Sequence, residues 1–190
     1  MPSVGLRITT LLATVLMVAV VSSCGQSSPA PAAPEAEHNA ADVAFAKNMI
    51  PHHHQALDMA AMVPSRTANR DLIVIANHIA PDQQSQIYTL QELLEQWGEP
   101  PAPEHMDHDG MAMAGMVDEA TMAKLATLHG PPFDELWLRS MIRHHEGAIA
   151  MAKPEITQGK NPTAVDMAKI IVDWQQLEIG RMNAMLGPAE

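Results

Sequence analysis

The stretch MIPHHHQALDMA at residues 49–60 returns as MIRHHEGAIAMA at residues 141–152. A single gap-free offset of 92 residues (144 − 52 = 92) aligns residues 42–94 with residues 134–186. The identical pairs cluster at the histidines, and few of them are the large aliphatic residues that a purely structural repeat would keep. This pattern indicates an internal duplication that carries a functional site.

On an α-helix, which turns by about 100° per residue, the shared residues of each copy fall on one stripe about 120° wide. The stripe holds two histidines, two methionines, two alanines and one aromatic residue, which is Phe45 in the first copy and Trp137 in the second. Such a stripe normally faces a protein core. His54 lies on the opposite face and is replaced by Glu146 in the second copy, so we expect His54 on the solvent side.

Each copy continues into a second amphipathic stretch, and no segment has the alternation of a β-strand. The expected helices cover residues 41–64, 68–97, 133–153 and 161–186, with a short helix at 118–128. Pro51 and Pro81 lie inside two of them and predict kinks. Two duplicated αα-hairpins with wide apolar stripes predict an all-α protein, a four-helix bundle.

The N-terminal region indicates export. Residues 1–23 contain one positive charge, Arg7, and an apolar run that is too short for a confident membrane span. The run ends in VSSC, which resembles a bacterial lipobox in which Cys24 becomes the lipidated N-terminus and holds the protein on a membrane. The alternative is ordinary secretion with a free thiol, because Cys24 is the only cysteine. We therefore expect a protein exported to the cell envelope.

Two further segments follow the predicted signal peptide. Residues 24–40 are rich in Ser, Pro and Ala, as in a flexible tether. Residues 41–190 form the duplicated domain, divided into a first repeat (41–98), a loop (99–117) and a second repeat (118–190). The exported part contains all 22 acidic and 10 of the 11 basic residues, so its formal charge is 10 − 22 = −12. This charge argues against nucleic acid as a partner.

The loop between the repeats has an unusual composition. It is polar, contains glycine and has no hydrophobic period, yet it holds four methionines and two histidines. Exposed methionines have no packing role there, so metal capture is the favoured interpretation and a plain linker is the alternative. The candidate ligands of this weaker site are His105, Met106, His108, Met111, Met113 and Met116.

Gln83 and its repeat mate Gln175 lie on otherwise apolar stripes, where each amide needs a hydrogen-bond partner. One interpretation is that the two glutamines orient histidines of the neighbouring helices. The other is a purely structural pair of buried amides.

The doubled histidine motif, the pair Phe133-Asp134 before its second copy, and the His/Met loop resemble the family called domain of unknown function 305. That family is ferritin-like and includes periplasmic copper-binding proteins of the CopM type. The resemblance covers Asp42 to about Leu186. It implies that the metal ligands in the bundle are Met49, His52, His53, Met59, Met141, His144, His145 and Met151. Pro51 against Arg143 and His54 against Glu146 are differences between the two halves.

Imidazole and thioether ligands without thiolate or carboxylate suit Cu(I) or Ag(I), and Cu(II) is compatible with the histidines. Zn(II) is a minor alternative, because four histidines from two helices would satisfy its usual ligand number. A di-iron centre needs paired Glu-x-x-His motifs with inward glutamates, and the predicted helices contain no Glu-x-x-His.

The sequence therefore predicts an exported protein that binds copper or silver and contributes to metal buffering or resistance at the cell envelope. We find no nucleophile beside a base and no Gly-rich phosphate loop, so no enzymatic activity is expected. A structural or partner-binding bundle without metal is the first alternative. A copper-dependent oxidase, which would need an open coordination position, is the second.

Overall fold

The computed structural model describes residues 37–103 and 113–187. Within these residues the chain is entirely helical, without strands. Its elements are α1 (Ala40–Met62), a 3-10 turn η1 (Val63–Ser65), α2 (Arg70–Gln96), α3 (Glu119–Leu125), α4 (Pro131–Gln158) and α5 (Pro162–Leu186). The predicted signal sequence, Cys24 and most of the predicted tether lie outside the described residues. No described helix has the length and apolar character needed to cross a membrane.

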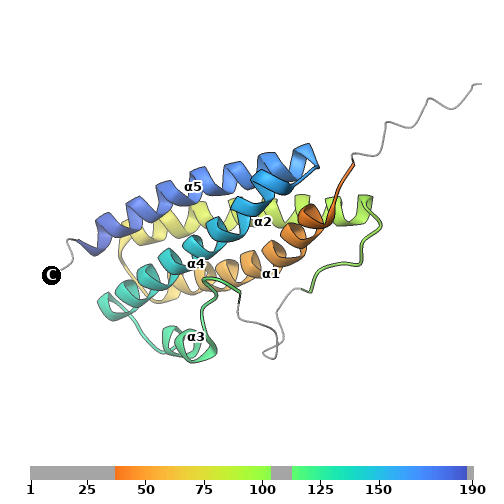
Figure 1. Cartoon of the computed structure of the whole chain (residues 1–190). Coiled ribbons are helices and arrows are strands. Elements are labelled where there is room, and N and C mark those ends of the chain that lie inside the picture. Colours follow the sequence, from red (N-terminus) through yellow and green to blue (C-terminus); the bar gives the residue numbers. More distant parts are fainter. Residues whose placement is uncertain (1–36, 104–112, 188–190) are drawn as a thin grey trace, which may run out of the picture. The chain divides into compact units, whose positions relative to one another are not determined.

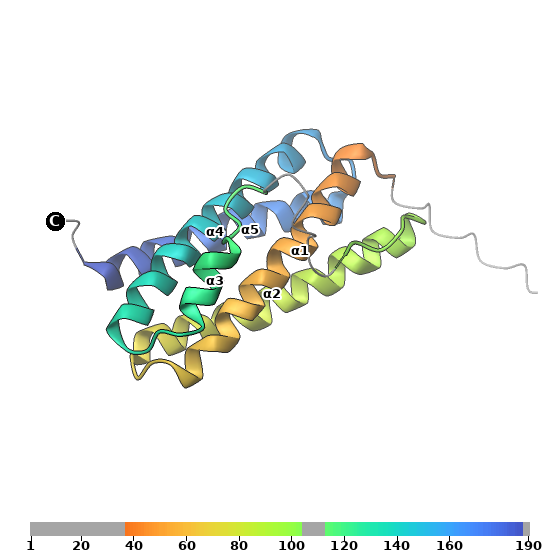
Figure 2. The same cartoon turned by 90° about the horizontal axis from the view of Figure 1, so that it is seen from below.

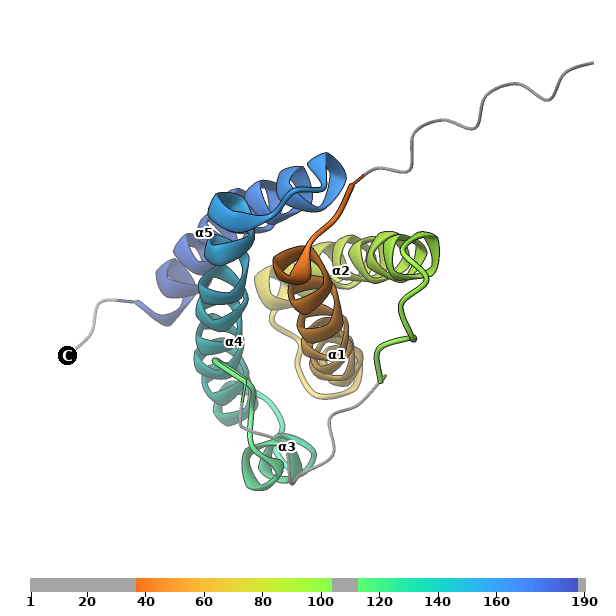
Figure 3. The same ribbon diagram turned by 45° about the vertical axis from the view of Figure 1, so that its right-hand side comes forward.

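Helices α1 and α2 form one hairpin and α4 and α5 form the other (Figure 1). The two hairpins meet mainly through α1 and α4, while α2 and α5 approach each other less closely. The short helix α3 belongs to the connection between the hairpins and packs on α4 (Figures 2 and 3). The expected all-α four-helix bundle of two αα-hairpins is confirmed.

Side-chain caps begin α1, α2, α3 and α5, whereas α4 begins at Gly130 without one. Asn39 caps α1 and forms a reciprocal capping box with Asp42, which is thus the first-turn acid rather than the cap itself. Asn69 and its repeat mate Asn161 cap α2 and α5 in the same way. Helix α4 continues through Pro154 to Gln158, five residues beyond the expected end. Pro154 does not end the helix, because it only removes one backbone donor.

The apolar core is divided into two clusters along the bundle axis. Along α1, Phe45 to Ile50 belong to one cluster and Ala56 to Val63 to the other. Along α4, Phe133 to Ile142 belong to the second cluster and Ala148 and Ala152 to the first. The paired histidines of both helices lie between the clusters. A buried polar layer is therefore enclosed by apolar packing on either side.

A second buried polar group lies at the end of the bundle where α1 starts. Asp42 is fully buried and accepts hydrogen bonds from the backbone N–H groups of Asn39, Lys160 and Asn161 at 2.6, 3.1 and 2.9 Å. Glu155, which is only 1% exposed, shares a hydrogen bond with Asp42. Burial, this hydrogen bond and the Asp42 charge raise the pKa of Glu155 to about 8.

Replacing Glu155 with glutamine is expected to stabilise the protein in alkaline solution. Because the folded-state pKa is raised from 4.5 to about 8, the folded protein binds more protons than the unfolded chain between those values. The free energy of unfolding of the wild type therefore falls as pH rises through this window. Glu155→Gln lacks that loss and should be more stable by about 2 kcal/mol at pH 8.5, with a smaller difference at pH 5. Thermal unfolding of both proteins at pH 5 and pH 8.5 measures the stability difference at each pH. The control is Glu146→Gln, an exposed change on the same helix, whose stability relative to wild type should not change with pH.

Candidate metal centre

Four histidines from α1 and α4 form the centre of the buried polar layer. His52, His53, His144 and His145 are all 0% exposed. The rings of His52 and His144 contact each other across the helix interface, with centroids 3.8 Å apart and planes inclined by 34°. The ring centroid of His53 lies 6.3 Å from that of His52, and the ring centroid of His145 lies 6.5 Å from that of His144. The structure thus brings together the four histidines that the repeat singled out.

Three of the four imidazoles face a hydrogen-bond acceptor through Nε2. His53 Nε2 lies 2.7 Å from the side-chain oxygen of Gln86 on α2. His145 Nε2 lies 2.8 Å from a carboxylate oxygen of Glu178 on α5. His52 Nε2 lies 3.2 Å from the backbone oxygen of Ala114. Because a carbonyl or carboxylate oxygen only accepts, each of these Nε2 atoms carries the proton and donates.

This arrangement leaves the lone pair of each of these rings on Nδ1. In all four histidines Nδ1 is buried without a hydrogen-bond partner, and His144 lacks a partner at Nε2 as well. A histidine that ligates a metal usually donates its other ring N–H to a carboxylate or a carbonyl, which holds the ring in the tautomer needed for ligation. His52, His53 and His145 share this feature of metal-ligating histidines: Nε2–H is donated to an oxygen and Nδ1 is left unpaired.

Burial keeps the imidazoles of His52, His53 and His144 neutral. Loss of hydration lowers the pKa of His52 and of His53 to about 3, and the neighbouring histidines add to the effect. The same causes hold the pKa of His144 well below its usual value. A metal ion competes with protons for the ring nitrogen, so these three side chains are available as ligands throughout the physiological pH range.

The end of the His/Met loop covers the histidines on the α1–α4 face. Gln55 holds it through two hydrogen bonds of 2.8 Å, one to the backbone N–H and one to the carbonyl of Val117. A Cβ atom added to Gly147 would lie 1.9 Å from the Ala114 oxygen, so only glycine fits beneath the segment. Gln55 and Gly147 are repeat mates (147 − 55 = 92), and their difference creates the seat for residues 113–117.

The four methionines predicted as ligands lie on the same two helices. Met49, Met59 and Met141 are fully buried and Met151 is half-buried. Within the described ranges no three His, Cys, Asp or Glu side chains are grouped so that they could hold a metal ion.

The hydrogen bonds expected from Gln83 and Gln175 are made by other residues. Both glutamines are buried, and neither amide atom of Gln83 nor the side-chain oxygen of Gln175 has a hydrogen-bond partner. Gln86 and Glu178 lie about one turn further along the same helices and contact the histidines instead. Gln86 and Glu178 are also repeat mates (178 − 86 = 92). Because one is an amide and the other a carboxylate, they are not among the identical pairs of the repeat.

The family model of DUF305, a domain of unknown function, matches residues 42–186 of the chain. The chain belongs to this family. The predicted resemblance is confirmed. No curated protein matches the chain.

Solved DUF305 structures share the fold. A DUF305 fragment from Deinococcus radiodurans is 36% identical, with a TM-score of 0.71 over 78% of this chain and 97% of that one. A DUF305 protein from Streptomyces coelicolor, whose description proposes secretion, is 32% identical, with a TM-score of 0.69 over 77% and 91%. CopM in its Cu(II)-bound form is 32% identical, with a TM-score of 0.65 over 74% and 92%. CopM has also been solved with Cu(I), with silver and without metal. These likenesses relate the chain to copper proteins and support export.

Six residues were predicted as ligands in the loop between the repeats. Four of them lie outside the described residues: His105, Met106, His108 and Met111. Met113 and Met116 are half-buried in the segment over the histidines. His54 is half-buried on α1 and takes no place in the four-histidine cluster.

Proposed function

We propose that this DUF305 protein binds copper or silver ions through His52, His53, His144 and His145 and buffers them at the cell envelope. The observation that carries the proposal is the set of acceptors at Nε2. A carboxylate, an amide oxygen and a backbone carbonyl each fix one buried ring so that Nδ1 remains free for a metal.

The chemistry favours soft ions. Neutral imidazoles and buried thioethers are the ligands that Cu(I) and Ag(I) prefer, and the imidazoles also accept Cu(II). CopM, which shares the fold at 32% identity, was crystallised with Cu(II) and, in related structures, with Cu(I) and silver. A structural role alone would leave five buried ring nitrogens unpaired, at a cost of about 1–3 kcal/mol each.

We further propose that Cys24 anchors the protein by lipidation, with residues 25–40 as its tether. The lipobox-like VSSC supports this anchor. Acyl chains contribute about 0.8 kcal/mol per buried CH₂, and more than one chain holds a protein stably on a membrane.

Native mass spectrometry of the soluble form from Gly25 onward should show retained Cu(I) or Ag(I) in the presence of a competing chelator, whereas Zn(II) should be lost. The soft ions match the imidazole and thioether donors, and Zn(II) lacks a preformed group of three or four ligands. Deleting residues 105–112 should reduce the number of weakly held ions and leave the tightest one. If no soft ion is retained at micromolar competition, the metal-binding function is wrong.

A further inference from the structure

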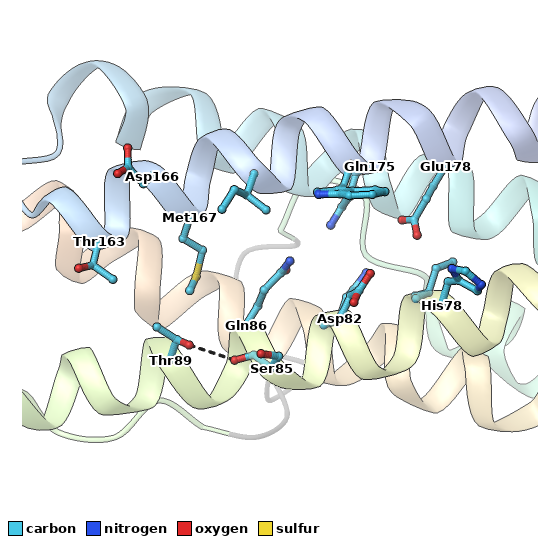
Figure 4. Close-up of a pocket in the computed structure, with 14 residues that line it drawn as sticks. His78, Asp82, Ser85, Gln86, Thr89, Thr163, Asp166, Met167, Gln175 and Glu178 are labelled. Carbon is cyan, nitrogen blue, oxygen red and sulfur yellow. Dashed lines mark hydrogen bonds between the residues drawn. The ribbon is translucent and has the colours of Figure 1, made fainter.

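A groove of about 650 Å³ runs between α2 and α5, on the side of the bundle opposite the segment that covers His52. It exists because α2 and α5 approach each other less closely than α1 and α4, the pair through which the two hairpins mainly meet. Figure 4 shows side chains from both helices facing each other across it. Its lining includes Asp82, Gln83 and Gln86 from α2 and Asp166, Gln175 and Glu178 from α5.

The charge of the groove is one-sided. Asp82 comes from α2, and Asp166 and Glu178 come from α5, while the described lining includes no lysine or arginine. Asp166 also pairs with Lys169 at 2.8 Å, but both side chains are exposed and solvent screens the pair, so Asp166 contributes to the field together with Asp82 and Glu178. An acidic concave surface raises the local concentration of cations.

Two buried amides also point to a polar occupant. Gln83 and Gln175 line the groove, and each is only 3% exposed. Both amide atoms of Gln83 and the side-chain oxygen of Gln175 have no hydrogen-bond partner. Their oxygens are suitable acceptors for the water shell of a hydrated ion, which would remove the cost of leaving them unpaired.

The inner wall of the groove is continuous with the histidine centre. Gln86 and Glu178 line the groove and also hydrogen-bond His53 and His145. A single side chain therefore separates the groove from each of these rings. On the opposite face, Gln55 and the close fit at Gly147 hold residues 113–117 against the helices.

We propose that the α2–α5 groove is a cation-binding vestibule through which copper or silver ions enter and leave the histidine centre. This inference rests on the proposed function, because it concerns the route to the same centre. Asp82 and Glu178 attract the hydrated ion, Gln83 and Gln175 accept from its water shell, and Gln86 and Glu178 form the gate to the imidazoles.

Stopped-flow mixing with Cu(II) ions, followed by quenching of tryptophan fluorescence, tests the route. Asp82→Asn/Asp166→Asn should slow loading and release by about 3- to 10-fold at low salt, with affinity unchanged within about twofold. The ionic-strength dependence of loading should weaken in the same variant. Ser85→Lys, which adds a positive charge at an exposed lining position, should slow loading further.

The matched control is Asp58→Asn/Glu146→Gln, which removes two exposed charges from α1 and α4 outside the groove. It should load at nearly the wild-type rate. Equal slowing in both double variants would mean that net charge alone sets the rate, and an unchanged rate in the groove variant would exclude this route. If the wild type itself retains no metal at equilibrium, the proposed function fails, and the vestibule fails with it. A wild type that binds while all variants load equally fast would overturn the vestibule alone.

Discussion

The variant His144→Leu is expected to be more stable than the wild type without metal and to lose tight copper or silver binding. Both ring nitrogens of His144 are buried without a partner, and its side chain is 0% exposed. An unpaired buried polar atom costs about 1–3 kcal/mol, whereas leucine fills a similar volume at no such cost. For a domain of this size a gain of 1 kcal/mol corresponds to a rise in Tm of about 2–4 °C.

The combination of higher stability without metal and lower metal affinity distinguishes a metal-binding histidine from a structural one. A histidine selected for packing would destabilise the protein when replaced, and its loss would leave metal affinity unchanged. A ligand that is maintained at the expense of stability gives the reverse. Calorimetry of the apo protein measures the first effect, and chelator competition with Ag(I) measures the second, for which we expect a loss of at least about 100-fold.

His54→Leu is the control for this variant, because it removes an imidazole from α1 outside the four-histidine cluster. Its Ag(I) affinity should stay within about twofold of wild type. Retained tight binding in His144→Leu would show that the metal is held elsewhere, with the loop residues as the next candidates.

The bundle could be predicted from the sequence because its information is local and repeated. A helical stripe in each copy and one constant offset suffice to place α1 opposite α4 in the core. The burial of His52, His53, His144 and His145 follows from the same stripe. The direct contact between His52 and His144 does not, because it depends on how the two helices cross.

The partners of the histidines could not be predicted in the same way. Gln83 and Gln86 lie on nearly the same helix face, and only the packed structure decides which of them reaches His53. The identity of Gln83 and Gln175 between the repeats favoured these two residues as the partners of the histidines. The residues that contact the histidines instead occupy positions at which the two repeats differ. The pair Gln86 and Glu178 is one such position, and the pair Gln55 and Gly147 is another.

The position at which residues 113–117 dock on the helices could not be predicted for a related reason. A loop without hydrophobic period carries no signal of where it docks. The signal is in the helices, where a glycine in the second copy replaces a glutamine in the first. A glycine inside a predicted helix is a sign of close backbone approach, and Gly147 meets the Ala114 carbonyl in this way.

Replacing Glu178 with glutamine is expected to lower the affinity for copper, and more for Cu(II) than for Cu(I). Glu178 accepts the His145 Nε2–H at 2.8 Å, and its charge makes Nδ1 a stronger donor to a metal. Glutamine retains an acceptor oxygen, as Gln86 does for His53, but removes the negative charge that compensates a bound cation. Outer hydrogen-bond partners of this kind typically change metal affinity by 10- to 100-fold, so we expect about a tenfold loss for Cu(II).

The repeat supplies the reciprocal variant. Gln86→Glu gives His53 the carboxylate that His145 has, and it should strengthen Cu(II) binding where Glu178→Gln weakens it. A tenfold preferential loss of Cu(II) affinity raises the Cu(II)/Cu(I) potential by about 59 mV, so equilibrium potentials of the two variants should move in opposite directions. Equal potentials in wild type and both variants would mean that neither His53 nor His145 ligates copper. Opposite shifts would instead show that the divergence of one repeat position sets which oxidation state the duplicated centre prefers.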